Sequence, residues 1–254
     1  MTTLTELHEQ AKLHTAKLQG GSGVLINGST DEFSYILTAK HVVMLCQQAG
    51  STDCSSCSKK VDCVELESRE VKIEPYGREP LIAKTMFRSE KWDALILQVP
   101  YQSDLSLSIS FNDVQPGASV TLFGYPDEAR RASEENHLQL KHFEMVKHGE
   151  VKQEKKLDFR NESYADKEGV GGFSGGGLFS FEPEKDCVVL IGIENRMDNV
   201  ESESNHICGV MLSAFTDVIR ANELEELKPL HLKNFKHSEY LIFESVGLES
   251  MSLT

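Results

Sequence analysis

Short runs of β-type sequence recur along most of this chain and constrain its fold more than any other feature. They are rich in β-branched, aliphatic and aromatic residues, and turn-forming residues separate them. The runs are Val24–Asn27, Ser34–Thr38, Val71–Glu74, Leu81–Phe87, Ala94–Val99, Val120–Phe123, His137–Phe143, Leu178–Phe181, Val188–Ile193 and Ile207–Leu212. Many short strands with few long helical stretches predict an all-β protein built as barrels or as a pair of sandwiched sheets.

Helical patterns are expected near both ends of the folded part. Residues 1–19 carry apolar residues spaced as on one helix face, and Gly20 breaks the pattern. These apolar residues are Leu4, Leu7, Ala11 and Leu18. Phe215–Leu224 predicts a second helix, with Phe215, Val218 and Ile219 on one side.

Composition excludes several classes of protein. The chain has 40 acidic and 26 basic residues, for a net charge of −14, so phosphate backbones and anionic lipid would repel it. We therefore expect no nucleic-acid partner and no membrane, and no apolar run approaches the roughly 18 residues of a spanning helix. The N-terminus lacks the basic start and apolar centre of a signal peptide, which predicts a cytoplasmic protein.

Three local patterns carry candidate chemistry. A strand-like run ends at His41, Asp93 opens the apolar run Ala94–Leu97, and Ser174 is embedded in glycines. Acyl transfer needs a hydroxyl nucleophile, a base to take its proton, a carboxylate to orient the base, and backbone N–H groups facing the oxyanion. Glycines around a nucleophile allow the backbone conformations that such N–H groups require. The order His, Asp, Ser is that of the chymotrypsin-type triad.

On these motifs the sequence resembles trypsin-like (chymotrypsin-fold) serine peptidases, of a bacterial-type cytoplasmic branch. Thr38–His41 is similar to the T-A-x-H signature, and Gly172–Gly176 is similar to G-D-S-G-G. Gly21–Ile26 resembles the first strand of the bacterial branch, Ile191–Ile193 the strand after the nucleophile, and Gly209–Ser213 the penultimate strand. The resemblance covers about residues 21–225.

The resemblance implies a chymotrypsin-like fold of two antiparallel six-stranded β-barrels, with the catalytic cleft between them. His41 would be general base and then general acid, Asp93 would fix its tautomer, and Ser174 would attack the scissile carbonyl. The backbone N–H groups of Gly172 and Ser174 would form the oxyanion hole. The expected units are an N-terminal helix (1–19), a first barrel (20–112), a second barrel (113–213), and a C-terminal helix and tail (214–254).

Each of these residues also has a structural interpretation. His41 alone could be a buried structural histidine, Ser174 could belong to an ordinary glycine-rich turn, and Asp93 could cap a strand, with Asp104 a nearby competitor. The three motifs together favour catalysis. Asp93 is preferred because it directly precedes an apolar run.

Phe173 departs from the family pattern. Secreted digestive members have Asp immediately before the nucleophile, where it pairs with a freshly cut N-terminus. A phenyl ring cannot make that ion pair, so we expect no activation by N-terminal cleavage. Regulation would then come through loop ordering or through a partner.

The resemblance places the base of the primary substrate pocket six residues before the nucleophile, at Glu168. A buried carboxylate there would favour substrates with Lys or Arg at the cleavage site. The alternative is a solvated loop residue within Tyr164–Glu168.

Four cysteines cluster with the spacing C-x7-C-x2-C-x5-C. They are Cys46, Cys54, Cys57 and Cys63. Four thiolates suit a closed tetrahedral zinc site, which would brace the turn that carries His41. Free thiols, or two disulfides in an exported protein, are the alternatives, and no cofactor is expected for catalysis itself.

The sequence thus predicts a cytoplasmic serine endopeptidase that cuts one or a few protein partners. Its resemblance to stand-alone bacterial members suggests a regulated effector, activated by a sensor protein in a stress or defence system. One alternative is a catalytically silent trypsin-fold module that binds partners through the cleft. Another is an esterase or a peptidase that works only in complex with a partner.

Overall fold

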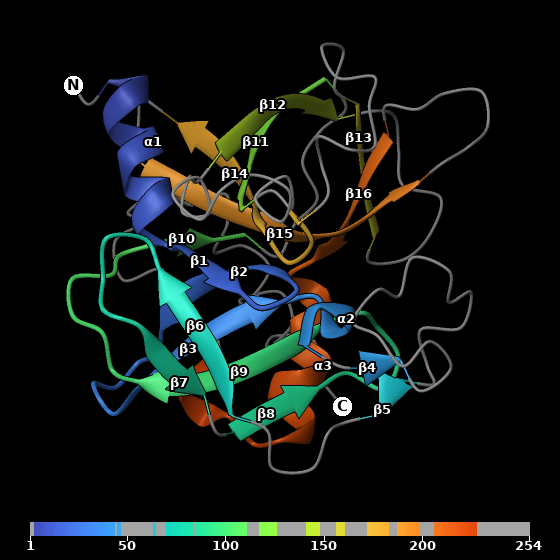
Figure 1. Cartoon of the computed structure of the whole chain (residues 1–254). Helices are drawn as coiled ribbons and strands as arrows, with labels where there is room; N and C mark the ends of the chain where they lie inside the picture. The colour runs from blue at the N-terminus through green and yellow to red at the C-terminus, as the bar shows by residue number, and fades with distance from the viewer. Residues whose placement is uncertain are drawn as a thin grey trace, which may run out of the picture.

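Two β-sheets, each with seven strands among the described residues, form the framework of the computed structural model (Figure 1). The structure describes residues 3–43, 45–46, 63–64, 70–83, 85–110, 117–125, 141–147, 156–160, 172–182, 187–198 and 206–227. Helices are few and short within these ranges, so the protein is mostly β.

The first sheet is antiparallel at every strand pair. In spatial order its strands are β7 (Leu81–Ala83), β6 (Val71–Pro75), β1 (Thr15–Leu18), β2 (Gly21–Asn27), β3 (Phe33–Thr38), β9 (Leu95–Pro100) and β8 (Thr85–Arg88). Side chains alternate between its faces, as strand geometry requires. Leu25, Ile36 and Leu97 pack on one face, in a cluster made mostly of residues of the first sheet.

The second sheet includes a closed ring. In spatial order its strands are β10 (Ser108–Ile109), β15 (Cys187–Asp198), β14 (Gly177–Glu182), β11 (Ser119–Gly124), β12 (Lys141–Lys147), β13 (Lys156–Arg160) and β16 (His206–Met211). An additional pairing between β15 and β16 closes six of these strands, and β10 joins β15 in parallel. Leu122, Met145 and Ile207 belong to the apolar cluster of this sheet.

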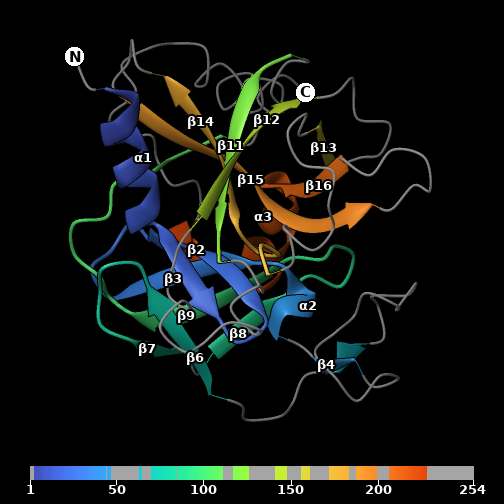
Figure 2. The ribbon, with the colours of Figure 1, turned by 45° about the horizontal axis from the view of Figure 1, so that its top comes forward.

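A shared apolar cluster joins the two sheets. Tyr35 and Ile96 enter it from the first sheet, and Phe123 and Phe179 enter it from the second. Helix α1 (Leu4–Leu13) contacts β14 and β15, and helix α3 (Ser213–Ala221) contacts β9 and β16 (Figure 2). Both helices bury apolar side chains in the shared cluster, so they fasten the sheets to each other.

Four short elements complete the described part. Helix α2 (Lys40–Val43) follows β3, and the 3-10 helix η6 (Glu225–Leu227) follows α3. Strands β4 (Leu45–Cys46) and β5 (Cys63–Val64) pair only with each other in this part of the chain. No helix among the described residues has the length and apolar character needed to cross a membrane.

Two expectations from the sequence need correction. The N-terminal helix expected within residues 1–19 ends at Leu13, because His14 and Leu25 bond to each other through their main chains and draw the following residues into β1. Leu18 is therefore a strand residue, buried in the first sheet. Among the described residues, the first sheet also has seven strands rather than six, with β1 between β2 and β6, and β10 adds a seventh strand to the six that close the ring of the second sheet.

Candidate active site

His41 and Asp93 meet through two hydrogen bonds. The Nδ1 atom of His41 is 2.8 Å from Oδ2 of Asp93, and the backbone N–H of His41 donates to Oδ1 of Asp93 at 3.1 Å. The side chains are largely buried, with exposed fractions of 15% for His41 and 6% for Asp93. An ionised carboxylate can only accept, so Nδ1 donates to Asp93, and in the neutral ring Nε2 then carries the lone pair.

Asp93 lies in a tight turn that Ser89 closes. The backbone N–H of Ser89 donates to the carbonyl of Ala94 at 2.9 Å. Its hydroxyl oxygen accepts from the backbone N–H of Lys91 at 3.3 Å and from that of Trp92 at 2.9 Å. Ser89 is buried, so these bonds are shielded from water and hold the turn between β8 and β9 in one conformation.

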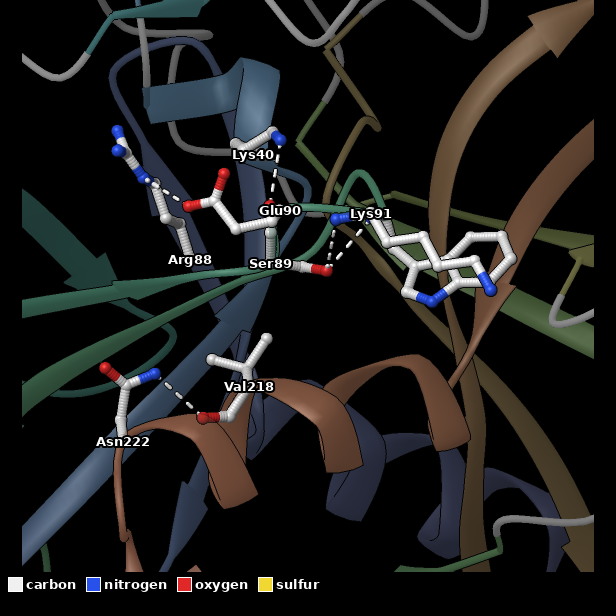
Figure 3. Close-up of polar contacts among 8 residues, drawn as sticks. Lys40, Arg88, Ser89, Glu90, Lys91, Val218 and Asn222 are labelled. Atoms are coloured by element: carbon white, nitrogen blue, oxygen red, sulfur yellow. Dashed lines mark hydrogen bonds and ion pairs between the residues drawn. The ribbon is translucent and has the colours of Figure 1, made fainter.

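Lys40 joins this turn to the helix that carries His41. Its Nζ atom donates to the backbone carbonyl of Ser89 at 3.0 Å (Figure 3). A second tie runs from the other side, where the indole N–H of Trp92 donates to Asp217 of α3 at 3.2 Å. The residues directly before His41 and before Asp93 therefore both anchor the turn.

Ser174 occupies a turn between Gly172 and Gly176. The backbone N–H of Gly176 donates to the carbonyl of Phe173 at 2.7 Å. Because the Phe173–Ser174 peptide is planar and trans, this bond fixes the direction of the Ser174 N–H, which points away from that carbonyl. Gly175 has a φ of 87°, and a Cβ there would collide with the Ser22 carbonyl and the Thr38 hydroxyl. Glycine is therefore required at that position.

The turn that carries Ser174 and the helix that carries His41 meet at Gly21 of β2. A Cβ built on Gly21 would clash with the carbonyl oxygen of Ser174 and would lie 3.1 Å from Cγ2 of Val42. Val42 directly follows His41, so β2 brings Ser174 and the His41 helix against the same glycine. On the other side, the turn bonds to the backbone of Glu194 in β15. The Glu194 carbonyl accepts from the Gly175 N–H, and the Glu194 N–H donates to the Gly176 carbonyl, both at 2.8 Å.

Phe173 is completely buried, in the apolar cluster of the second sheet. Its ring lies so close to Gly124 of β11 that a Cβ there would approach Cδ1 of Phe173 to 2.8 Å. The side chain before Ser174 therefore anchors the turn through packing.

The structure describes only some of the other residues that the sequence predicted for the site. Asp104 is exposed and accepts a hydrogen bond from the Ser103 hydroxyl at 3.0 Å. Cys46 and Cys63 are direct Cα partners in the β4–β5 pair. Glu168, Cys54 and Cys57 lie outside the described residues.

Sequence reasoning missed three residues that bond within the site. Ser22, Lys40 and Ser89 hold its backbone, yet their partners are up to 150 residues away in the chain. The available signal was slight: serine is common in turns because its hydroxyl can bond the backbone two residues on, as Ser89 does with Lys91.

The trypsin-like peptidase domain matches residues 21–192, well over half of the chain. The chain belongs to the trypsin-like peptidase family. The match spans β2 to β15 and so includes His41, Asp93 and Ser174. A peptidase domain implies protein or peptide substrates. No curated protein sequence matches the chain significantly.

Solved structures of serine proteases share the chymotrypsin-like fold of this trypsin-like peptidase. The active form of the Rv3671c protease of M. tuberculosis is 15% identical, with a TM-score of 0.57 over 84% of this chain and 82% of that one. Its inactive form is 16% identical, with a TM-score of 0.54 over 85% and 91%. The serine endoprotease of Yersinia pestis is 15% identical, with a TM-score of 0.58 over 87% of this chain and 66% of that one.

Proposed function

We propose that this trypsin-like peptidase is a serine endopeptidase that uses His41, Asp93 and Ser174 as its catalytic triad. The observation that carries the proposal is the two-point contact of Asp93 with the Nδ1 atom and the backbone N–H of His41. That contact holds the ring in one plane and one tautomer, which leaves Nε2 able to take a proton. A histidine with a purely structural role has no need of a free, oriented Nε2.

The first half of the reaction forms an acyl-enzyme. The hydroxyl oxygen of Ser174 bonds to the scissile carbonyl carbon while its proton passes to Nε2 of His41. The N–H groups of Gly172 and Ser174 stabilise the negative carbonyl oxygen. The C–N bond then breaks, His41 returns the proton to the departing amine, and an ester links Ser174 to the acyl group.

The second half releases the acyl group. A water molecule attacks the ester carbon and gives a proton to Nε2 of His41. The bond to Ser174 breaks, the proton returns to its oxygen, and the product leaves as a carboxylic acid. These steps use the chain's own side chains and backbone and need no cofactor.

A fluorophosphonate probe tests the proposal, because it labels a serine only where the nucleophile, base and oxyanion hole work together. We expect labelling at Ser174 in the wild-type protein and none in Ser174→Ala or His41→Ala. Thermal unfolding of each variant checks that it is folded. Labelling that persists in Ser174→Ala would contradict the proposal.

Partner dependence is read in the same assay. Labelling that needs a partner protein supports a peptidase that works only in complex. A folded wild-type protein that stays unlabelled with every candidate partner contradicts the peptidase proposal. That result would favour a catalytically silent partner-binding module.

We further propose regulation by a partner rather than by N-terminal cleavage. The buried phenyl ring of Phe173 supports this, because the residue before Ser174 is held by apolar packing and offers no charge to a new N-terminus. An activating sensor protein, a role in bacterial stress or defence and a cytoplasmic location stay predictions from the sequence.

A further inference from the structure

Ser22 belongs to the first sheet but bonds the turn that carries Ser174. It is completely buried in β2. Its backbone N–H donates to the carbonyl of Ser174 at 2.8 Å, and its hydroxyl donates to the carbonyl of Gly172 at 3.0 Å. Its hydroxyl oxygen also accepts from the backbone N–H of Tyr125 at 2.8 Å, and its carbonyl accepts from the Thr38 hydroxyl at 2.7 Å.

The direction of these bonds follows from the donors and acceptors. A backbone N–H can only donate, so Tyr125 uses a lone pair of the Ser22 oxygen. A backbone carbonyl can only accept, so the single hydroxyl proton of Ser22 points at Gly172. Both capacities of the hydroxyl are therefore used inside the protein.

These contacts fix the peptide planes around Ser174. Ser22 holds the carbonyls of Gly172 and Ser174, and Gly176 holds the intervening carbonyl of Phe173. Three successive peptide groups are thus each restrained by a hydrogen bond. The middle one carries the Ser174 N–H, and Ser22 holds the peptide groups on both sides of it. The restraint matters at Gly172, whose φ of 88° and missing side chain leave its backbone free to rotate.

We propose that Ser22 is a positioning residue for the oxyanion hole, setting the backbone orientation of Gly172–Ser174 from the opposite sheet. This rests on the proposed function, because it concerns the N–H groups that would stabilise the oxyanion. Thr38 extends the link, since it bonds Ser22 and stands three residues before His41. The base and the oxyanion hole are therefore held in register through one buried serine.

Ser34 offers a matched control. It is also completely buried in the first sheet, in β3. Its hydroxyl likewise donates once, to Oδ1 of Asn27 at 2.6 Å, and accepts once, from the backbone N–H of Gln102 at 2.7 Å. Neither partner belongs to the turn that carries Ser174.

The test is fluorophosphonate labelling of Ser22→Ala and Ser34→Ala, resolved into the labelling rate kinact and the binding constant KI. Loss of one oxyanion donor slows serine proteases about 100- to 1,000-fold, so misplacing the donors should lower kinact of Ser22→Ala by about 10- to 100-fold. KI should stay unchanged, because the probe's initial binding does not use the oxyanion hole. Ser34→Ala should label as the wild-type protein does, although both variants melt at lower temperatures.

The outcomes separate the two proposals. If Ser22→Ala and Ser34→Ala have the same kinact, the positioning role of Ser22 is overturned, whether that value equals the wild-type one or is lower. This outcome leaves the proposed function untouched. A wild-type protein that is not labelled at Ser174 overturns the proposed function, and the positioning role with it. If Ser22→Ala does not fold, Ser22→Cys and Ser34→Cys replace the pair under the same criterion.

Discussion

The ammonium group of Lys40 donates to the backbone carbonyl of Ser89 at 3.0 Å, and this bond joins the His41 helix to the Asp93 turn (Figure 3). Lys40 is buried, with an exposed fraction of 7%. A lysine is seldom buried unless its charge has a partner. Lys40 thus ties together the two segments that carry His41 and Asp93.

Replacing Lys40 by methionine tests the hydrogen bond to Ser89 separately from the volume of the side chain. Lys40→Met keeps most of the volume but removes the donor, so His41 and Asp93 lose part of their fixed geometry. A shift of about 1 Å in such a pair can cost up to about 100-fold in rate, and we expect about a 10-fold fall in fluorophosphonate labelling. Lys72→Met, at an exposed lysine paired with Glu74, is the control and should label normally. Normal labelling of Lys40→Met would contradict this role.

Phe173 should matter for stability as well as for the turn. Truncating a fully buried phenylalanine costs about 3–5 kcal/mol, so Phe173→Ala should lower the free energy of unfolding by that amount. Urea unfolding monitored by fluorescence measures it. Phe87→Ala, at a half-buried residue of β8, should cost less. A loss of under about 1 kcal/mol in Phe173→Ala would show that the ring is not a packing anchor.

His14 should make the protein sensitive to mild acid. Burial lowers the pKa of His14 from 6.5 to about 4, although the hydrogen bond from its ring to the Leu25 carbonyl opposes this shift. Burial disfavours the charged ring in the folded state. The stability that depends on a neutral His14 is therefore fully present above about pH 6.5 and is lost as the pH falls toward 4. The loss should reach about 3 kcal/mol.

Urea unfolding between pH 7.5 and 4 measures this loss in the wild-type protein and in His14→Gln. The variant should show a flatter dependence across that window, because glutamine does not titrate. Parallel curves for the two proteins would mean that other groups cause the acid sensitivity.

A zinc ion on the four clustered cysteines remains a prediction. The structure places Cys46 opposite Cys63 across β4 and β5, which brings the first and last members of the motif together at the level of the backbone. Metal analysis of protein purified without chelator should find about one zinc per chain. Cys46→Ser should reduce that content, whereas Cys187→Ser, outside the cluster, should not. Wild-type protein with almost no zinc would refute the site.

Most strands could be predicted because a strand places alternate side chains on opposite faces, and burial of those faces selects recognisable runs of apolar and β-branched residues. The runs around Val24, Ile36 and Ile96 form β2, β3 and β9, whose apolar residues face two different clusters. The single run Leu81–Phe87 instead divides into β7 and β8, which pair with different neighbours. A short run of strand-forming residues contains no mark of such a change of partner.

Other elements left no local signal. Strands β4, β5 and β10 have two residues each, too few for a period to appear. The apolar spacing of α1 continues through Leu18, although the chain has already become a strand there. The His41, Asp93 and Ser174 motifs were visible in the sequence, but the hydroxyl and ammonium groups that hold them act on backbone atoms, which every residue has.

The turn that carries Ser174 is hydrogen-bonded to the backbone of β2 on one side and to the backbone of Glu194 in β15 on the other. A ribosome makes β2 early and β15 late. The growing chain therefore contains His41 and Asp93 well before β15 can bond to the turn that carries Ser174. Under the proposed function, the triad and the oxyanion hole are therefore complete only after β15 has been made and has paired with its neighbours.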